Sequence, residues 1–411
     1  MTKLLKLAWR DIWRNRRRSL LTMGAIVFAV VIISLANSVQ YGTYDAMEEL
    51  VVRVYTSDLQ VHRAGFQEER TLSYSMEENE QDWARCFDDY PWVEAVSKRL
   101  TGFGLASSDS TSAGALIVGI EPENERAIST FANTPAQGQA LSSEDRQSVL
   151  LGATLARNLN VTVGDSVVVL TQGYRNVMGA DLYRVKGLVR TGSPDVDRAM
   201  MIMPLADAQY LFSMEGRFTE VVLRTNNFRR AESYASALRA DLGEERYEVM
   251  PWRAMMPELQ QMRALDDAGN YIFYVFLVLL IGFEIFNTTT MSMMERVREF
   301  GVMMSIGMKP RQISLLVTLE LMMKVLLALA AGFVIMAVAL AFLKDNPIPV
   351  TGELQQFYEE WGFTVEGISF SARPVIFLFP MLSVATVALL SMIYPILRMR
   401  RFSPVQALRT T

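Results

Sequence analysis

The chain has 411 residues, which leaves room for two or three domains, and 51% of them are hydrophobic. One cysteine and one histidine exclude an intrachain disulfide and argue against a metal or catalytic site built on these residue types. The formal net charge is only −4, but the charges are strongly segregated along the chain. We therefore expect no metal site, no catalytic residue and no cofactor on this chain.

Four apolar stretches are long enough to cross a bilayer as helices. The first carries no charged residue, and its 20 residues measure about 30 Å as a helix, which is the thickness of a hydrocarbon core. Buried core helices of soluble proteins are typically shorter and carry a polar stripe, of which these stretches show little. The sequence therefore predicts four transmembrane helices, at 20–39, 268–294, 313–343 and 374–397.

Lysine and arginine are concentrated in three short segments, the amphipathic N-terminus 1–19, the loop 295–312 and the tail 398–411. By the positive-inside rule these segments, and with them both termini, lie in the cytoplasm. The 40–267 segment and the acidic 344–373 loop then lie outside. A basic segment before an apolar stretch is also typical of a signal peptide. This stretch is too long for one and three more follow, so we expect an uncleaved first span.

The 40–267 segment alternates strand-like and helical runs, which is typical of a folded α+β domain. Its clearest unit, 148–170, combines a strand, a helix at 152–160 and a second strand after a Gly164-Asp165 turn. We expect two subdomains, with the first and second spans extending out as stalks. The other predicted strands are 57–62, 115–120, 182–189, 199–203, 218–224 and 246–251, and the other predicted helices are 81–89, 207–213 and 229–242.

Several features of this outer segment are expected to be structural. His62 and Cys86 are interpreted as incidental, and the methionines of 200–203 as core residues. The loop 172–181 between two strands is predicted to be a hairpin. It is either an ordinary solvated hairpin or a protrusion that docks a periplasmic carrier.

The sequence carries no enzyme signature. It has no G-x-x-x-x-G-K-[ST], and therefore no P-loop to hold nucleotide phosphates. It also lacks G-x-S-x-G and H-E-x-x-H. The acidic balance belongs to the outer segment, so no nucleic-acid partner is expected.

The segment 295–313 directly follows the second span. Its apolar residues recur at helical spacing, which predicts an amphipathic cytoplasmic helix. Gly301 and Gly307 each cost such a helix about 1 kcal/mol relative to alanine. Close approach to a partner, or a turn, would explain them. A basic helix resting on lipid headgroups is the alternative, but Glu295 and Glu299 lie where such a face requires cations.

The run E-R-V-R-E-F-G-V-M-M-S-I-G that begins at Glu295 closely resembles the E-R-x-R-E-[IF]-G-x-x-[RK]-[AS]-[IL]-G motif of the FtsX-like permease family. The segments 7–22, 151–165 and 394–409 resemble three further motifs of that family. The family includes the macrolide exporter MacB and the lipoprotein-releasing permeases LolC and LolE, and the layout is most similar to the last two. The chain departs from the family pattern at Met304, Ser403 and Gln406.

The resemblance implies a type VII-like ABC transporter permease in the bacterial inner membrane. Two permeases, alike or different, would pair, and each would bind a cytoplasmic ATPase that holds ATP and Mg. ATPase closure would push the helix after the second span, tilt the stalks and expel cargo, which is mechanotransmission. Membrane lipids are further partners, and a periplasmic carrier or adaptor is left open. The expected ATPase-coupling residues are Glu295, Arg296, Arg298, Glu299, Phe300, Gly301 and Gly307.

Charged side chains inside a span cost about 2.5–3.5 kcal/mol near the bilayer centre, so they normally face protein or water. Glu320 and Lys324 lie four residues apart on one helix face, so they either neutralise each other inside the span or both lie near the cytoplasmic interface, and the second position is favoured for Glu320. Glu284 lies about 16 Å along its helix from Glu295 and is therefore deep. With Asn287 it is expected to form a polar patch that holds helices together or contacts cargo.

Three functions fit these features. Extraction of lipoprotein or another lipophilic cargo is favoured by the length, the four spans and the missing ATPase. Efflux of a small molecule or peptide would require a periplasmic adaptor. An FtsX-like regulator of cell-wall hydrolases would move no cargo, and the large outer segment weighs against it.

Overall fold

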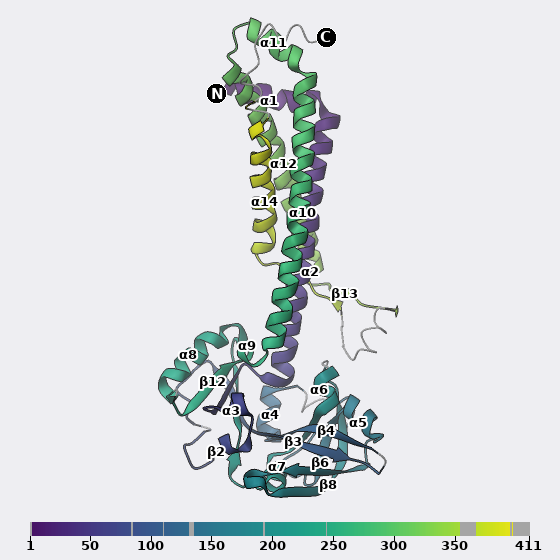
Figure 1. Cartoon of the computed structure of the whole chain (residues 1–411), viewed down its shortest axis with the longest axis vertical. Helices are drawn as coiled ribbons and strands as arrows, with labels where there is room; N and C mark the ends of the chain where they lie inside the picture. The colour runs from purple at the N-terminus through teal and green to yellow at the C-terminus, as the bar shows by residue number, and fades with distance from the viewer. Residues whose placement is uncertain are drawn as a thin grey trace. The chain divides into compact units, whose positions relative to one another are not determined.

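The computed structural model describes residues 2–83, 85–109, 111–130, 135–191, 194–243, 245–353, 367–394 and 397 (Figure 1). The chain forms two compact units, each of which is described by itself. The helical unit comprises residues 1–45, 262–349 and 367–411, and the sheet unit comprises residues 46–261 and 350–366. The predicted tail 398–411, with parts of the predicted fourth span (395–396) and of the predicted outer loop (354–366), lies outside the described residues.

Long apolar helices make up the helical unit. Three helical stretches are long and apolar enough to cross a membrane, namely Arg16–Val54, Leu259–Glu295 and Pro310–Leu343. The fourth predicted span corresponds to a shorter apolar helix of 17 described residues, so the number of four spans stays a prediction. The helices are α1 (Thr2–Arg14), α2 (Arg16–Val51), α10 (Pro257–Glu295), α11 (Val297–Ser305), α12 (Pro310–Leu343) and α14 (Val375–Ser391).

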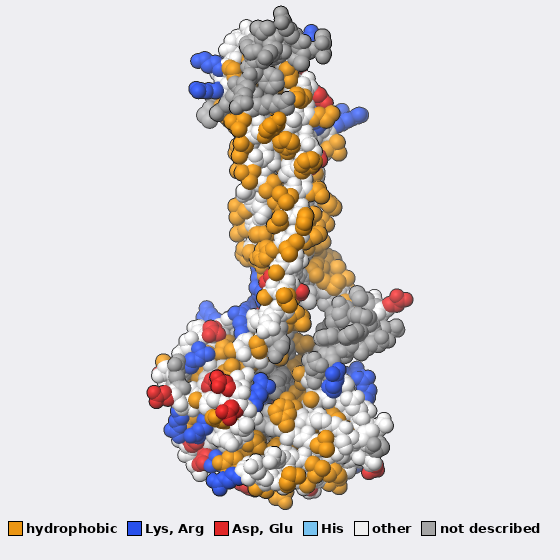
Figure 2. All heavy atoms as spheres, in the orientation of Figure 1, with side chains coloured by type: hydrophobic (Ala, Val, Ile, Leu, Met, Phe, Trp, Pro, Cys, Tyr) orange, Lys and Arg blue, Asp and Glu red, His pale blue; other side chains and the backbone are white. Residues whose placement is uncertain are grey.

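The long helices of this unit pack closely where one of them carries a glycine. A Cβ on Gly282 of α10 would lie 2.4 Å from the side chain of Val387 in α14, and Ser391 donates a 3.0 Å hydrogen bond to the Gly282 carbonyl. Gly332 of α12 faces Val30 of α2 in the same way. Small residues at helix crossings are typical of membrane bundles. The outward faces are apolar, and hydrophobic side chains cover most of the helical unit visible in Figure 2.

The sheet unit is built on one mixed sheet. Among the described residues it has ten strands in the order β12-β1-β11-β3-β4-β9-β6-β8-β5, with β7 paired to both β3 and β8. The β4–β9 and β6–β8 pairs are parallel and the others are antiparallel. The strands are β1 (Leu59–Arg63), β3 (Val93–Ser107), β4 (Ser112–Ile120), β5 (Gln137–Gly138), β6 (Ser148–Gly152), β7 (Ser166–Gln172), β8 (Met178–Val189), β9 (Met200–Pro204), β11 (Glu220–Thr225) and β12 (Tyr247–Pro251).

Short helices and two small strand pairs complete the chain. The β2 (Met76–Glu77) and β10 (Arg217–Phe218) strands pair, as do β13 (Ile348–Pro349) and β14 (Gly367–Ile368). The short helices are α3 (Phe66–Glu69), α4 (Pro122–Ile128), α5 (Ala153–Leu159), α6 (Pro194–Ala199), α7 (Leu205–Phe212), α8 (Ala231–Leu242) and α9 (Trp252–Met255).

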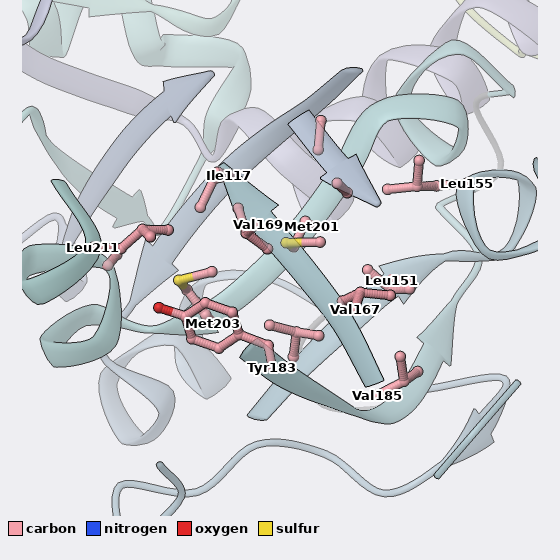
Figure 3. Packing of buried hydrophobic residues seen from close by; sticks show 14 of the residues in the cluster. Ile117, Leu151, Leu155, Val167, Val169, Tyr183, Val185, Met201, Met203 and Leu211 are labelled. Carbon is pink, nitrogen blue, oxygen red and sulfur yellow. The ribbon is translucent and has the colours of Figure 1, made fainter. Parts of the chain in front are cut away.

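The sheet carries separate hydrophobic cores. One gathers residues of β3, β4 and β6–β9 with α5 and α7, and Figure 3 shows Met203 beside Tyr183 and Met201 beside Val169 within it. A second gathers residues of β1, β11 and β12 with α8. A third gathers residues of β4, β6, β8 and β9, Met200 among them. The three cores lie on one continuous sheet within a single compact unit, where the sequence predicted two subdomains. The placing of the 200–203 methionines in the core is confirmed.

The 148–170 unit is confirmed as β6, α5 and β7. The helix predicted at 81–89 is wrong, because its described residues form turns. Trp83 and Phe87 are buried in the second core, and the aspartates around them favour turns over a helix. The hairpin after β7 is shorter than predicted, since β7 and β8 pair up to Gln172 and Met178.

The single histidine and the single cysteine, His62 and Cys86, both have pKa values shifted by burial. Burial lowers the pKa of His62 to about 4, so the ring is neutral in β1, where it stacks on Phe66. Burial, together with the charges of Asp82 and Asp88, raises the pKa of the Cys86 thiol to about 12. A thiol with such a pKa is unreactive at neutral pH.

Candidate functional site

Arg296 occupies the junction between α10 and α11 and is 6% exposed. Its Nη2 donates to Asp11 Oδ2 of α1 at 2.6 Å, and its Nη1 donates to Glu320 Oε2 of α12 at 2.8 Å. Its Nε donates to Glu299 Oε2 of α11 at 3.2 Å. The planar guanidinium presents its donors in a fixed fork, so one side chain ties three helices to the end of α10.

Further ion pairs extend this arrangement. Lys324 Nζ donates to the second oxygen of Glu320 at 2.8 Å. Arg14 of α1 donates to Glu299 at 2.6 Å, and Arg18 of α2 pairs with both oxygens of Glu295. The name ion network is used below for Asp11, Arg14, Arg18, Glu295, Arg296, Glu299, Glu320 and Lys324.

The centre of the ion network is buried and balanced in charge. Asp11, Arg296, Glu320 and Lys324 are each at most 8% exposed, with two positive and two negative charges among them. Burial disfavours the charged form of Arg296, but the charges of Glu320 and Asp11 outweigh it and raise the pKa of the guanidinium. Since removing one partner of a buried pair leaves a charge uncompensated, the four side chains depend on one another.

Glu299 links the buried centre to the surface. Partial burial would raise the pKa of its carboxyl, but hydrogen bonds from Arg14 and Arg296 outweigh burial and lower that pKa. Glu299 is therefore ionised at neutral pH. The ring of Phe300, one residue later, lies with its centroid 5.2 Å from the Arg296 guanidinium carbon, within the range of a cation–π contact.

The predicted coupling residues separate into an inward and an outward group. Glu295, Arg296 and Glu299 bond to other helices of the unit, and Phe300 and Gly301 are buried. Arg298 is exposed, and so are Val302 (46%) and Ile306 (81%), which follow it at intervals of four residues. Sequence reasoning missed this apolar part of the outward face. Arg298, Val302 and Ile306 together form what we call the outward face of α11.

The predicted helix over 295–312 is interrupted. α11 ends at Ser305, and Gly307 has φ +105°, in the left-handed region that favours glycine. Met308 N donates to the Met303 carbonyl at 3.0 Å and closes the turn before α12 begins at Pro310. Of the two explanations for Gly307, the structure supports the turn.

The polar residues predicted inside the spans lie in two different settings. Glu320 and Lys324 are brought together with Arg296 in the ion network. Glu284 and Asn287 are exposed on α10, and Glu284 accepts a 3.0 Å hydrogen bond from Thr288 on the same helix. The structure therefore does not join Glu284 to the ion network.

Sequence reasoning also missed the α1 and α2 members of the ion network. Asp11, Arg14 and Arg18 are 277 to 285 residues from their partners, so no local pattern indicates the pairing. One signal was present, because Asp11 is the single acid among seven basic residues in 1–19.

Two family models match the chain. The MacB-like periplasmic core domain matches residues 19–241, and the FtsX-like permease C-terminal matches residues 271–404. The chain belongs to the FtsX- and MacB-type ABC transporter permeases. The matched models are of transmembrane permease subunits rather than of ATPases, and the family together with the three long apolar helices indicates an inner-membrane protein.

Curated relatives and solved structures are similar at low identity. The permease is 25% identical over 202 residues to the lipoprotein-releasing system transmembrane protein LolC of Xylella fastidiosa, covering 48% of each chain. It is 20% identical over 249 residues to LolC of Neisseria meningitidis, covering 57% of this chain and 59% of the relative. The match therefore spans about half the length of these relatives.

Two solved outer regions also match. The periplasmic region of MacB from Actinobacillus actinomycetemcomitans is 14% identical with a TM-score of 0.36, covering 51% of this chain and 95% of that one. The extracellular domain of the noncanonic ABC-type transporter YknZ from Gram-positive bacteria is 15% identical with a TM-score of 0.34, covering 47% and 100%.

Proposed function

We propose that this permease has four spans with both termini in the cytoplasm, and that it transmits force from a separate pair of ATPases to its sheet unit outside. The cargo is lipoprotein or another lipophilic molecule taken from the inner membrane. The supporting comparison is with LolC, whose name places it in a lipoprotein-releasing system. A second permease, identical or related, completes the transporter.

The observation that carries this proposal is the ion network around Arg296. A push on α11 reaches α1 through Arg14 and Asp11, α10 through the chain itself, and α12 through Glu320. Separating two buried, paired charges is costly, because each charge would then remain in the protein interior without an opposite charge beside it. The network therefore moves these helices together rather than letting α11 bend alone.

The outward face of α11 is the proposed contact with the ATPase. Arg298, Val302 and Ile306 combine one positive charge with exposed apolar surface, and the inward residues of the same segment are already engaged in the network. An apolar surface beside a charge is typical of a protein interaction site. Gly301 and Phe300 support this face from behind, and Gly307 supplies the turn.

The test is reconstitution of the permease and its ATPase in lipid nanodiscs, with Arg298→Glu as the variant. We expect loss of ATPase binding and of ATPase stimulation with an unchanged thermal unfolding midpoint, because Arg298 is exposed. Arg230→Glu, a charge reversal at an exposed site of the sheet unit, is the matched control. Normal binding and stimulation by Arg298→Glu would contradict the assignment of this face.

Cargo is tested separately, by native purification of the complex followed by mass spectrometry of the lipids and lipidated proteins that accompany it. Lipoproteins enriched over a matched membrane background would support the cargo proposal. A complex that stimulates its ATPase yet enriches no lipidated protein would reject lipoprotein as cargo while leaving force transmission intact.

A further inference from the structure

Helix α1 has two faces with different chemistry. One face packs on α12 through buried Ala8 and Ile12, and Asp11 on this face reaches Arg296. The opposite face is exposed to solvent. Figure 1 shows α1 lying across the ends of the long helices of its unit rather than along them.

The exposed face presents a stripe of large apolar side chains. Leu5, Trp9 and Trp13 recur every four residues and are 38%, 46% and 51% exposed. The two indoles contact each other edge to face, with ring centroids 5.9 Å apart. Tryptophan at an exposed helix surface is typical of the boundary between membrane and water, where its apolar ring and its N–H are both satisfied.

A basic row borders this stripe. Lys6 and Arg10 are exposed beside the indoles, and within the described part of the chain neither forms an ion pair. The only acid of α1, Asp11, points to the other face and is occupied by Arg296. The exposed face of α1 therefore carries positive charge and apolar surface with no negative charge to offset it.

We propose that this face, made by Leu5, Trp9, Trp13, Lys6 and Arg10, binds anionic phospholipid. The indoles and Leu5 enter the headgroup region, and the two cations contact the headgroup phosphates. A zwitterionic lipid can bury the apolar side chains, but its headgroup has no net negative charge to attract Lys6 and Arg10. The surface therefore selects anionic lipid. The orientation of α1 across the helix ends suits a helix lying in the plane of the membrane.

The consequence concerns the ion network. Asp11 and Arg14 belong to the same helix as the lipid-binding face, so bound lipid fixes the helix whose other side holds Arg296 and Glu299. This inference rests on the proposed cytoplasmic, membrane-side position of α1, but lipid binding itself is measured without the ATPase.

The experiment uses the full-length permease in nanodiscs that contain either brominated phosphatidylglycerol or brominated phosphatidylcholine at the same fraction. Bromine quenches nearby indoles, and the Trp9→Phe/Trp13→Phe double variant supplies the signal of the other tryptophans for subtraction. Quenching at several brominated fractions gives the relative affinity of the face for the two lipids. Each basic residue near a membrane surface contributes about fivefold to binding of anionic lipid.

We expect wild type to prefer phosphatidylglycerol by about 25-fold, about fivefold from each of the two cations, and Lys6→Gln/Arg10→Gln to lose most of that preference. Arg184→Gln/Arg230→Gln removes two exposed charges from the sheet unit and is expected to retain it. Equal quenching by both lipids in wild type would overturn the selection of anionic lipid. Absence of quenching by either lipid would show that Trp9 and Trp13 do not lie in the membrane and would overturn the whole inference.

The same discs separate this inference from the proposed function. Lipid preference with no response of an added ATPase would reject the force-transmitting role and leave the lipid site standing. ATPase stimulation without lipid preference would reject the lipid site and leave the force-transmitting role standing.

Discussion

The two ends of the helical unit join their helices by different chemistry. At the α11 end, four buried charges centred on Arg296 connect α1, α10, α11 and α12. At the opposite end, mostly uncharged donors make the connections. Tyr274 donates to Asn37 at 2.5 Å, Gln40 donates to Asp267 at 2.8 Å, and Ser371 and Ser38 bond through their backbones. The Asp45–Arg373 ion pair at this end is partly exposed.

This difference indicates which end more strongly resists separation of its helices. A hydrogen bond between neutral groups contributes about 0.5–1.5 kcal/mol net, and one to a carboxylate such as Asp267 about 1.5–3 kcal/mol. Water can replace these bonds when the helices separate, so helices joined by them separate more easily than helices joined by buried ion pairs. Buried paired charges have no such exchange available, because each partner alone would be desolvated without compensation. We infer that the α11 end moves as one body and that the opposite end is the more adaptable one.

The largest expected effect is that of Arg296→Met, which keeps an unbranched apolar stem but removes the guanidinium. Asp11 and Glu320 are then left buried with an excess of negative charge, and we expect a loss of about 3–5 kcal/mol in stability. Chemical or thermal unfolding in detergent measures this loss. Arg298→Met, two residues away but exposed, is the matched control and is expected to change stability by less than about 0.5 kcal/mol. Equal effects of the two variants would remove the distinction between buried and exposed charge.

At the opposite end, Tyr274→Phe deletes one neutral hydrogen bond and leaves Asn37 Oδ1 without this donor. We expect a cost of about 1–2 kcal/mol, clearly smaller than that of Arg296→Met. Tyr271→Phe is the control, since Tyr271 is 55% exposed. A cost for Tyr274→Phe equal to that of Arg296→Met would contradict the inference that the two ends differ in rigidity.

The sequence predicted the parts of this molecule that depend on neighbouring residues. Apolar runs identified the long helices, and the Gly164-Asp165 turn with its flanking alternation identified α5 and β7. It did not predict the ion network as a whole, because Asp11 and Arg296 meet only after two helices pack, 285 residues apart. The helix predicted at 81–89 failed for a related reason, since burial of Trp83 and Phe87 in a distant core outweighed local propensity.

A third and smaller effect concerns acid. The folded-state pKa of Glu299 lies below the ordinary value of 4.5, so its contribution to stability is present above that pH and is lost as pH falls through the folded pKa. We expect Glu299→Gln to lower the unfolding midpoint at pH 7 and to narrow its difference from wild type below about pH 4. Glu68→Gln, which changes an exposed carboxyl of the sheet unit, serves as the control. A difference that stays constant from pH 7 to pH 3 would show that Glu299 acts through packing rather than through its charge.

The smallest effect is expected at the exposed edge of the ion network, where Arg18 and Glu295 are 32% and 48% exposed. Water and ions reach this pair, so Arg18→Gln is expected to cost about 0–1 kcal/mol, and the cost is expected to vanish in about 1 M salt, where the Debye length is about 3 Å. The cost of Arg296→Met is expected to persist in the same salt, because ions do not enter the buried centre. Measuring the free energy of unfolding of both variants at low and high salt therefore distinguishes the pairs that salt screens from those that it does not. If Arg18→Gln lost as much stability as Arg296→Met, independently of salt, the Arg18–Glu295 pair would belong to the rigid centre. The rigid centre would then include α2.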